Sequence, residues 1–432
     1  MSEPPLEPLR TLRRYFGTDG VRGVFGVDLT PDLVEQLGRA FAAWSRGRDV
    51  LLGRDTRASG PVLEQALAHG LSACGSDVAV GGVLPTPAVA LLASESGAVV
   101  SASHNPAEYN GVKFFAEGSK PTDEEEEQIE ACFGALAASR PGHVGAVGGC
   151  AERYGALLCE RFGGPLRGLR IVIDCANGAM SAVAPATFAR LGAEVIAVAT
   201  QPNGSNINEG CGATDLSLLA QTVPKHGAAL GVAFDGDGDR VLAVDADGQE
   251  IDGDQIVAIL ALHYDVDLVA VTVMSNGGFH RLMGEHGVRV VTTDVGDRYV
   301  LEALRREGGV LGGEQSGHVL WLDGHVSGDG LAAALLLCRA LVEHGTTLAE
   351  AAAVMPRFPQ AKANVLVRTK TLTPAITELA EQLNKQLAGS GRVLVRPSGT
   401  EPLMRVLAEA EIASDAAEIC SRMRQVVERE LG

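Results

Sequence analysis

The sequence predicts an α/β protein of three or four domains, and three observations support this. The chain has 432 residues, whereas a single domain usually takes about 100–200. Short apolar runs typical of strands alternate with helical segments, which indicates helices layered on a largely parallel or mixed sheet. The end of the chain has a different pattern, in which strands and helices form a smaller α+β unit. The sequence therefore predicts three similar α/β domains with mixed sheets, followed by a smaller α+β domain.

The three α/β units follow one plan. Each opens with a strand that leads into a polar or glycine-containing loop and then a helix, and a second strand follows. The first strands are expected at 49–53, 169–173 and 268–273, and the second strands at 77–80, 194–198 and 288–291. A third strand then delivers one distinctive loop in each unit: Ser101–Pro106, Asp235–Arg240 and Glu314–His318. Ligands bind outside the strand ends in such sheets, which is where these loops are expected. The likeness of the three units can also arise by chance, because α/β units of similar length resemble one another.

The C-terminal unit is predicted from two strands, at 364–369 and 392–395, and two amphipathic helices, at 374–387 and 413–431. Its loop, Arg396–Pro402, is expected between two strands. The domains are accordingly expected at residues 1–150, 151–250, 251–360 and 361–432.

Composition narrows the class of protein. Hydrophobic residues make up 46% of the chain, yet no apolar run approaches the ~18 residues of a membrane span. The start, Met1-Ser2-Glu3-Pro4-Pro5, lacks the charged and then apolar pattern of a signal peptide. The eight cysteines are scattered with no CxxC pair, which is typical of reduced thiols in a cytoplasmic protein. A net charge of −18 argues against nucleic acid or an anionic membrane as partner.

The second distinctive loop is predicted to bind a hard metal ion. Asp235, Asp237 and Asp239 alternate with glycines, which lets the backbone curl until the three carboxylates converge. Oxygen ligands at this density suit Mg²⁺, which would neutralise charge on a transferring phosphoryl group. A calcium EF-hand does not fit, because its loop needs Gly where Arg240 stands and Glu where Ala246 stands. An ordinary Asp/Gly turn is the structural alternative.

The first distinctive loop offers a candidate nucleophile, Ser103. His104 and Asn105 can orient groups around it, and Pro106 stiffens the exit from the loop. Lys113 lies in a short strand that can return beside the serine, where an ammonium can neutralise charge and move a proton. A Ser–His hydrolase is a poor alternative, because adjacent residues on one loop rarely face each other and the chain has no GxSxG motif.

Two further loops supply groups for a phosphorylated sugar. Glu314, Ser316 and His318 present a carboxylate, a hydroxyl and an imidazole within five residues, a set suited to sugar hydroxyls and general-base work. The segment from Arg396 to Thr400 offers a guanidinium, two hydroxyls and free backbone N–H groups, which together make a nest for phosphate. Arg405 follows closely, and the segment 14–23 contributes further arginines among glycines. The four loops together hold the groups needed for phosphoryl transfer to or from a sugar.

These loops closely resemble those of the α-D-phosphohexomutase family. The resemblance extends from Arg14 to Arg405, and the Ser-His-Asn-Pro, Asp-Gly-Asp-Gly-Asp-Arg and Arg-Pro-Ser-Gly-Thr-Glu-Pro motifs carry it. The bacterial phosphoglucosamine mutase branch is the most similar, on the motif Phe16–Gly20 and on Gln315, where phosphomannomutase-like relatives typically carry Met. No catalytic position departs from the family pattern.

The resemblance implies a four-domain, heart-shaped enzyme that interconverts glucosamine 6-phosphate and glucosamine 1-phosphate. Ser103 would be a phosphoserine that donates its group to the sugar and takes back the other phosphate of a bisphosphate intermediate. The product would feed UDP-N-acetylglucosamine and the cell wall. The resemblance implies a role for each of these residues. Mg²⁺ would be bound by Ser103, Asp235, Asp237 and Asp239, and the transferring group would be contacted by Arg240, Lys113, Arg22 and His104. The sugar would be bound by Glu314 and Ser316, with His318 as a proton shuttle, and the other phosphate by Arg396, Ser398, Gly399, Thr400 and Arg405.

The expected partner is a small-molecule sugar phosphate, with a kinase or a bisphosphate priming Ser103 and the protein acting as a monomer or homodimer. Two alternatives stay open at this point. One is a mutase of the same fold that prefers glucose or mannose phosphates. The other is a non-catalytic sugar-phosphate binder, which would be expected to have lost the serine or a metal ligand; this chain has lost neither.

Overall fold

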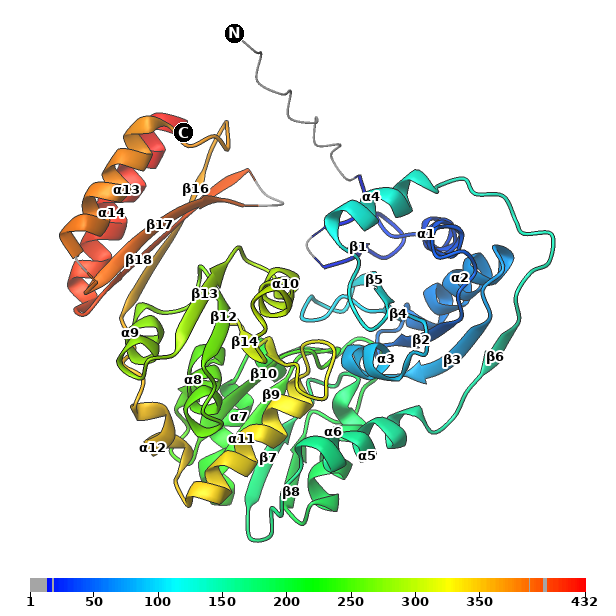
Figure 1. Ribbon diagram of the computed structural model, residues 1–432, viewed down its shortest axis with the longest axis horizontal. Helices are drawn as coiled ribbons and strands as arrows, with labels where there is room; N and C mark the ends of the chain where they lie inside the picture. The colour runs from blue at the N-terminus through cyan, green and yellow to red at the C-terminus, as the bar shows by residue number, and fades with distance from the viewer. Residues whose placement is uncertain (1–13, 18, 388, 399–401) are drawn as a thin grey trace. The chain divides into compact units, whose positions relative to one another are not determined.

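The structure, a computed structural model, describes residues 14–17, 19–387, 389–398 and 402–432. Its strands form four sheets, of six, five, four and three strands, which follow one another along the chain (Figure 1). The first three sheets combine parallel with antiparallel pairs, and the fourth pairs its strands antiparallel. The predicted series of three mixed α/β layers followed by a smaller α+β layer is confirmed.

The first sheet has the order β1-β5-β4-β2-β3-β6 and carries helices on both faces. Alternate strand residues point to opposite faces, so Leu52 and Phe114 join the core under α1, α2 and α4, whereas Leu51 and Phe115 join the core under α3. Phe41 of α1 stacks on Phe114 with ring centroids 4.2 Å apart. The elements are β1 (Val21–Val24), α1 (Pro31–Trp44), β2 (Val50–Arg54), α2 (Gly60–Ala73), β3 (Val78–Val83), α3 (Thr86–Leu92), β4 (Ser96–Val100), β5 (Tyr109–Ala116), α4 (Asp123–Ala131) and β6 (Val144–Ala146).

The second sheet has the order β11-β10-β9-β7-β8. Strands β7, β8 and β9 run parallel, and the hairpin of β9 and β10 turns the chain back at the sequence Asp235–Arg240. The elements are α5 (Cys150–Phe162), β7 (Arg170–Asp174), α6 (Met180–Arg190), β8 (Glu194–Val198), the short 3₁₀ helix η1 (Gly212–Thr214), α7 (Ser217–His226), β9 (Leu230–Phe234), β10 (Val241–Asp245) and β11 (Glu250–Ile251). The predicted strand 194–198 is β8.

The third sheet has the order β13-β12-β14-β15 and delivers the third distinctive loop between β14 and β15. Helix α11 begins at Gly330, where Asp329 accepts hydrogen bonds from the N–H groups of Leu331 and Ala332. The elements are α8 (Gly253–His263), β12 (Leu268–Thr272), α9 (Gly277–Glu285), β13 (Arg289–Thr293), α10 (Asp297–Glu307), β14 (Leu311–Gly313), β15 (Val319–Trp321), α11 (Gly330–His344) and α12 (Leu348–Ala353).

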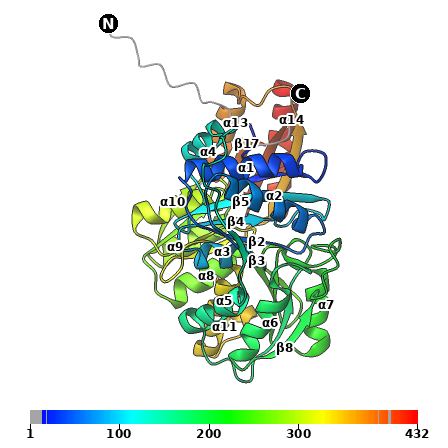
Figure 2. The same cartoon turned by 90° about the vertical axis from the view of Figure 1, so that its right-hand side faces the viewer.

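The fourth sheet, β16-β18-β17, has one face covered by two helices that lie side by side in both views (Figures 1 and 2). The helices match the sequence prediction, whereas the first strand was predicted at 364–369 and runs from Gln360 to Leu366. Its start was missed because only the small side chains of Ala361 and Ala363 mark its buried face. The elements are β16 (Gln360–Leu366), α13 (Pro374–Leu387), β17 (Gly391–Pro397), β18 (Leu403–Ala410) and α14 (Ala413–Leu431).

The chain divides into two compact units. One comprises Met1–Val273 and Val291–Ala352, and the other Met274–Val290 and Ala353–Gly432. Helix α9 belongs to the second unit because Asn276 bonds the backbone of Phe358 twice, through Nδ2 to the carbonyl (2.9 Å) and through Oδ1 from the N–H (3.0 Å).

Within the described residues no helix is long and apolar enough to span a membrane. The eight cysteines are unpaired thiols, as predicted.

Helices α1 and α2 pack so closely that two glycines are required between them. A Cβ on Gly70 would lie 2.1 Å from the carbonyl oxygen of Glu35, and one on Gly38 would lie 2.7 Å from that of Leu67. Both obstacles are backbone atoms, so relief requires the helices to move apart. The same contact brings α1 and α2 together over the sheet that ends in the Ser103 loop.

We expect Gly70→Ala to lower the free energy of unfolding of this domain by ~1–3 kcal/mol, because overpacking forces the two helix backbones apart. The measurement is chemical denaturation followed by circular dichroism. Gly148→Ala is the matched control, since it adds the same atom in the first 150 residues where no heavy atom lies within 4 Å. Equal midpoints for the two variants would contradict the close helix contact.

Candidate active site

Three buried carboxylates form the centre of the candidate site. The hairpin between β9 and β10 brings Asp235, Asp237 and Asp239 together so that one ligand oxygen from each lies within 4.8 Å of the others. The turn needs small residues, because a Cβ on Gly236 would lie 2.6 Å from the carbonyl oxygen of Ser103. Gly238 has φ +77°, a conformation that favours glycine.

Positive groups offset the charge of this triad. Lys113 Nζ lies 2.8 Å from Asp237 Oδ2 and 3.0 Å from Asp239 Oδ2. Burial opposes ionisation of Asp239, but the charges of Lys113 and His318 outweigh it and hold the pKa of Asp239 well below its usual value. Burial, aided by the charges of Asp239 and Asp237, instead raises the pKa of Asp235 to about 7.

The triad also fits a divalent metal ion. Its donors are all carboxylate oxygens, and the buried Oδ1 atom of Asp237 has no hydrogen-bond partner among the described residues. A buried acceptor without a partner is costly, which a bound cation would remedy. Hard oxygen donors suit Mg²⁺ and similar ions.

Ser103 lies directly against this triad. It follows β4 in the loop that the sequence singled out, and its hydroxyl donates a hydrogen bond to Asp235 Oδ2. His104 Nδ1 is 3.2 Å from the same Oγ. Burial and then the charges of Arg240 and Arg22 lower the pKa of His104 to about 3, so its imidazole is neutral at physiological pH. The candidate nucleophile and the neutral imidazole therefore come from the first sheet, and the acids come from the second.

The third loop brings two of its three predicted residues to the triad. Glu314 Oε2 lies 3.1 Å from His318 Nδ1, and His318 Nε2 lies 3.0 Å from Asp239 Oδ1. Burial lowers the pKa of His318, but the charges of Asp239 and Asp297 outweigh this effect and raise the pKa to about 10. While Asp239 keeps its charge, His318 is therefore an imidazolium, a form suited to proton donation. Ser316 is exposed on the same loop.

Two predicted arginines point unpaired donors into this charged region. The backbone N–H of Arg240 donates to Asp235 Oδ1 over 3.2 Å, and Arg22 pairs with Asp19. Burial lowers the pKa of Arg22, but the charges of Asp19, Asp237 and Asp239 outweigh this effect and raise that pKa above its usual value. The Nε atoms of Arg22 and Arg240 are both buried without a hydrogen-bond partner among the residues described. Such donors are suited to an anionic ligand.

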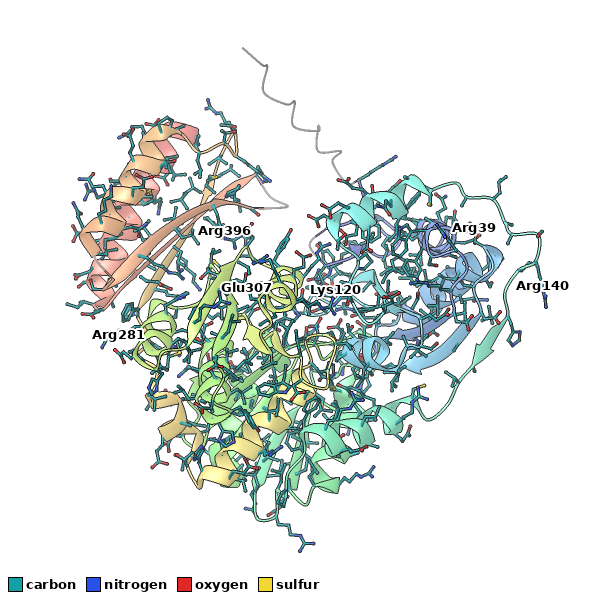
Figure 3. The ribbon with its side chains drawn as sticks, viewed as in Figure 1. Arg39, Lys120, Arg140, Arg281, Glu307 and Arg396 are labelled. Carbon is teal, nitrogen blue, oxygen red and sulfur yellow. The ribbon has the colours of Figure 1, made fainter. Side chains whose placement is uncertain are left out.

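Three residues that the sequence did not single out complete the network: Asp19, Lys120 and Asp297. Lys120 Nζ lies 2.6 Å from Asp19 Oδ1 and 2.7 Å from Asp297 Oδ2, and Asp19 also contacts Lys113 over 2.9 Å. Figure 3 labels Lys120 beside α10. Asp19 stands in the glycine-flanked segment noted from the sequence, which is a usable signal. No local sequence signal marks Lys120 or Asp297, because the two residues in contact are 177 positions apart in the chain.

The second unit holds the predicted phosphate loop. Arg396 of β17 lies directly opposite Arg405 of β18, on the strand face away from α13 and α14 (Figure 3). Burial, together with the charge of Arg405, lowers the pKa of Arg396. Two guanidinium groups at opposed strand positions are suited to bind an anion such as phosphate. Ser398 follows Arg396, whereas Gly399 and Thr400 lie outside the described residues.

Four family models match the chain in succession. Each is a domain of phosphoglucomutase/phosphomannomutase: α/β/α domain I at residues 13–139, domain II at 164–248, domain III at 252–358 and the C-terminal domain at 339–426. The chain belongs to the α-D-phosphohexomutase family. It has the four-domain architecture of these enzymes and is a mutase of the isomerase class.

Curated relatives of this phosphohexomutase are named phosphoglucosamine mutase. The one from Pelotomaculum thermopropionicum is 48% identical over 95% of this chain and 98% of its own length. The one from Thermobifida fusca is 47% identical over 97% of this chain and 99% of its own. A solved structure of a phosphoglucomutase/phosphomannomutase family protein from Burkholderia thailandensis has a TM-score of 0.81 at 27% identity, covering 95% of this chain and 96% of that one.

We expect Asp237→Asn to weaken Mg²⁺ binding at least about 10-fold, because even residues that only orient metal ligands contribute that much affinity. Isothermal titration with Mg²⁺ alone measures this without substrate. Asp247→Asn is the matched control, because Asp247 is an exposed acid in the next turn of the same sheet, between β10 and β11. Equal affinity of the two variants would show that the triad is a structural turn.

Proposed function

We propose that this phosphohexomutase interconverts glucosamine 6-phosphate and glucosamine 1-phosphate, with Ser103 as the carrier of the phosphoryl group. The observation that carries the proposal is the hydrogen bond of Ser103 Oγ to Asp235 within a buried acidic triad. The fold does not require three buried carboxylates around a serine. Phosphoryl transfer, in contrast, requires a metal ion, which these carboxylates can bind. The curated relatives named phosphoglucosamine mutase support the choice of sugar.

The metal ion proposed for the triad is Mg²⁺, held by Asp235, Asp237, Asp239 and an oxygen on Ser103. When bound, it would neutralise charge on the transferring phosphoryl group. Lys113 would stay as the fixed positive charge beside Asp237 and Asp239. A kinase or a hexose bisphosphate would prime the serine.

Transfer breaks the bond from phosphorus to Ser103 Oγ and forms a bond from phosphorus to a sugar hydroxyl oxygen. As the new bond forms, the hydroxyl proton passes to the group that protonates the freed serine oxygen, so that one proton moves from the sugar to Ser103 overall. His318, held as an imidazolium by Asp239 and Glu314, is suited to donate that proton. Arg22 and Arg240 are suited to bind the phosphoryl oxygens through their unpaired Nε atoms.

The sugar is proposed to bind through Glu314 and Ser316, and its non-reacting phosphate through Arg396, Ser398, Gly399, Thr400 and Arg405. After the first transfer the bisphosphate must turn over, so that its other phosphate returns to Ser103. The site around Ser103 and the phosphate site around Arg396 therefore each have to accept both ends of the bisphosphate. The choice of sugar is tested by comparing kcat/KM on glucosamine, glucose and mannose 6-phosphates; a higher value on either of the last two would overturn the assignment.

We expect Ser103→Ala to lower kcat at least ~10³-fold, because no oxygen remains to carry the phosphoryl group. Intact-mass measurement after priming should show one phosphoryl group on the wild type and none on the variant. Ser94→Ala is the control, since Ser94 is an exposed serine just before β4. Near-wild-type turnover of Ser103→Ala would rule out the phosphoserine.

We expect Arg396→Ala to raise KM about 10- to 100-fold with a smaller change in kcat, because an arginine–phosphate hydrogen bond is worth ~1.5–3 kcal/mol. Steady-state kinetics on glucosamine 6-phosphate measures both constants. The control is Arg422→Ala, which removes an exposed arginine from α14 of the same domain. A collapse of kcat at constant KM would instead place Arg396 at the reacting phosphoryl group.

A further inference from the structure

The loop that carries Ser103 is held from inside the protein by Arg57. This arginine follows β2 and is 1% exposed, so its guanidinium lies in the interior of the first domain. It touches none of the acids of the triad and has no place in the chemistry proposed above. Burying an arginine is costly unless every donor is used, so its contacts indicate what it is for.

All five N–H donors of this guanidinium are used, and four of them bind carbonyl oxygens of one loop. Nη2 donates to Ser103 O over 3.0 Å and to Asn105 O over 2.7 Å. Nη1 donates to Tyr109 O over 3.0 Å and to Pro106 O. A planar fork with five fixed donors fits this cluster of carbonyls, whereas an ammonium, with three donors at one point, does not.

The fifth donor connects Arg57 to the other side of Ser103. Nε donates to Asp55 Oδ2 over 2.9 Å, and the same carboxylate oxygen accepts a hydrogen bond from Ser101 Oγ over 2.7 Å. Ser101 Oγ in turn accepts the backbone N–H of Ser103 over 2.9 Å. The carbonyl and the N–H of Ser103 are therefore tied to one buried ion pair.

Ser103 needs such a hold because its backbone is strained. Its φ is +51°, in the left-handed region that costs a residue with a side chain roughly 1–2 kcal/mol. Asn208, from the second domain, also donates to the carbonyls of Ser103 and Asn105, over 2.9 and 3.2 Å. Rotation of this one residue would carry Oγ away from Asp235, so the hydrogen bonds on both of its peptide groups keep the hydroxyl at the metal-binding acids.

We propose that Asp55, Arg57 and Ser101 form a positioning device for Ser103, which holds the serine in a strained backbone conformation so that its oxygen faces the acidic triad. The inference rests on the proposed role of Ser103 as phosphoryl carrier. The three residues act through the loop backbone, so they are positioning residues. They set the rate of transfer rather than the binding of the sugar.

The first test is Arg57→Lys, which keeps the charge and loses the fork. We expect kcat on glucosamine 6-phosphate to fall by about 100-fold, since a displacement near 1 Å has that effect on a reacting group. The KM for the sugar phosphate should stay within about threefold of wild type. Arg39→Lys is the matched control: Arg39 lies on α1 of the same domain (Figure 3), paired with Glu35 rather than with the loop.

Hydrogen–deuterium exchange of the unliganded protein gives a readout that does not depend on activity. Arg57→Lys should speed exchange in peptides covering residues 101–109 and leave those of β2 and β4 unchanged. Ser101→Ala, a smaller change that cuts only the link to the Ser103 N–H, should do the same more weakly. Millimolar guanidinium should partly restore kcat to Arg57→Ala, and methylammonium should not.

Two results would overturn the positioning role. One is unchanged exchange at residues 101–109 with unchanged kcat in both Arg57→Lys and Ser101→Ala. The other is faster exchange spread evenly over the first sheet, which would make Arg57 a general stabiliser of the domain. The proposed function fails separately, if the wild-type enzyme turns over none of the three hexose phosphates; the exchange result would then still decide whether Arg57 holds the loop.

Discussion

The concentration of negative charge at Asp235, Asp237 and Asp239 is the constraint on which the rest of the active site depends. Three buried carboxylates within 4.8 Å repel one another and have lost most of their hydration. The surrounding fold supplies Lys113 and the imidazolium of His318, each at about 3 Å from an acid. These cations come from the first and third sheets, so the metal-binding hairpin of the second sheet is compensated by both of its neighbours.

The same constraint explains why the candidate catalytic groups come from loops at strand ends. A strand end delivers a side chain to a fixed point without interrupting the sheet, and each of the first three sheets delivers one such loop to the triad. The Ser103 loop has the most demanding geometry of these, because its serine has a left-handed backbone. A strained residue needs rigid support around it, and the role proposed for Ser103, which is to accept and donate the same phosphoryl group repeatedly, makes that support necessary.

A second layer of ion pairs connects the first and third domains beside the site. Lys120 joins Asp19 to Asp297, and the neighbouring Arg298 binds the start of α4 through Asp123 at 3.0 Å and Pro121 O at 2.8 Å. Buried and partly buried pairs of this kind are costly to break singly, because the partner is left uncompensated. The electrostatics of the site therefore depends on how the first and third domains are aligned. In the second unit, by contrast, two cations, Arg396 and Arg405, stand at opposed positions on neighbouring strands.

The sequence by itself determined the α/β class, the loops at strand ends and the polar groups that each loop carries, because alternation of apolar residues and runs such as Asp235–Asp239 are local signals. It placed α13 and α14 correctly for the same reason. Only the tertiary structure decided that Lys113 faces the acids, that His318 is charged and that Lys120 meets Asp297. These are consequences of contacts between residues far apart in the chain, and their pKa values depend on burial that no local pattern encodes. Arg57 is the clearest case, since its five donors have meaning only once the Ser103 loop folds over them.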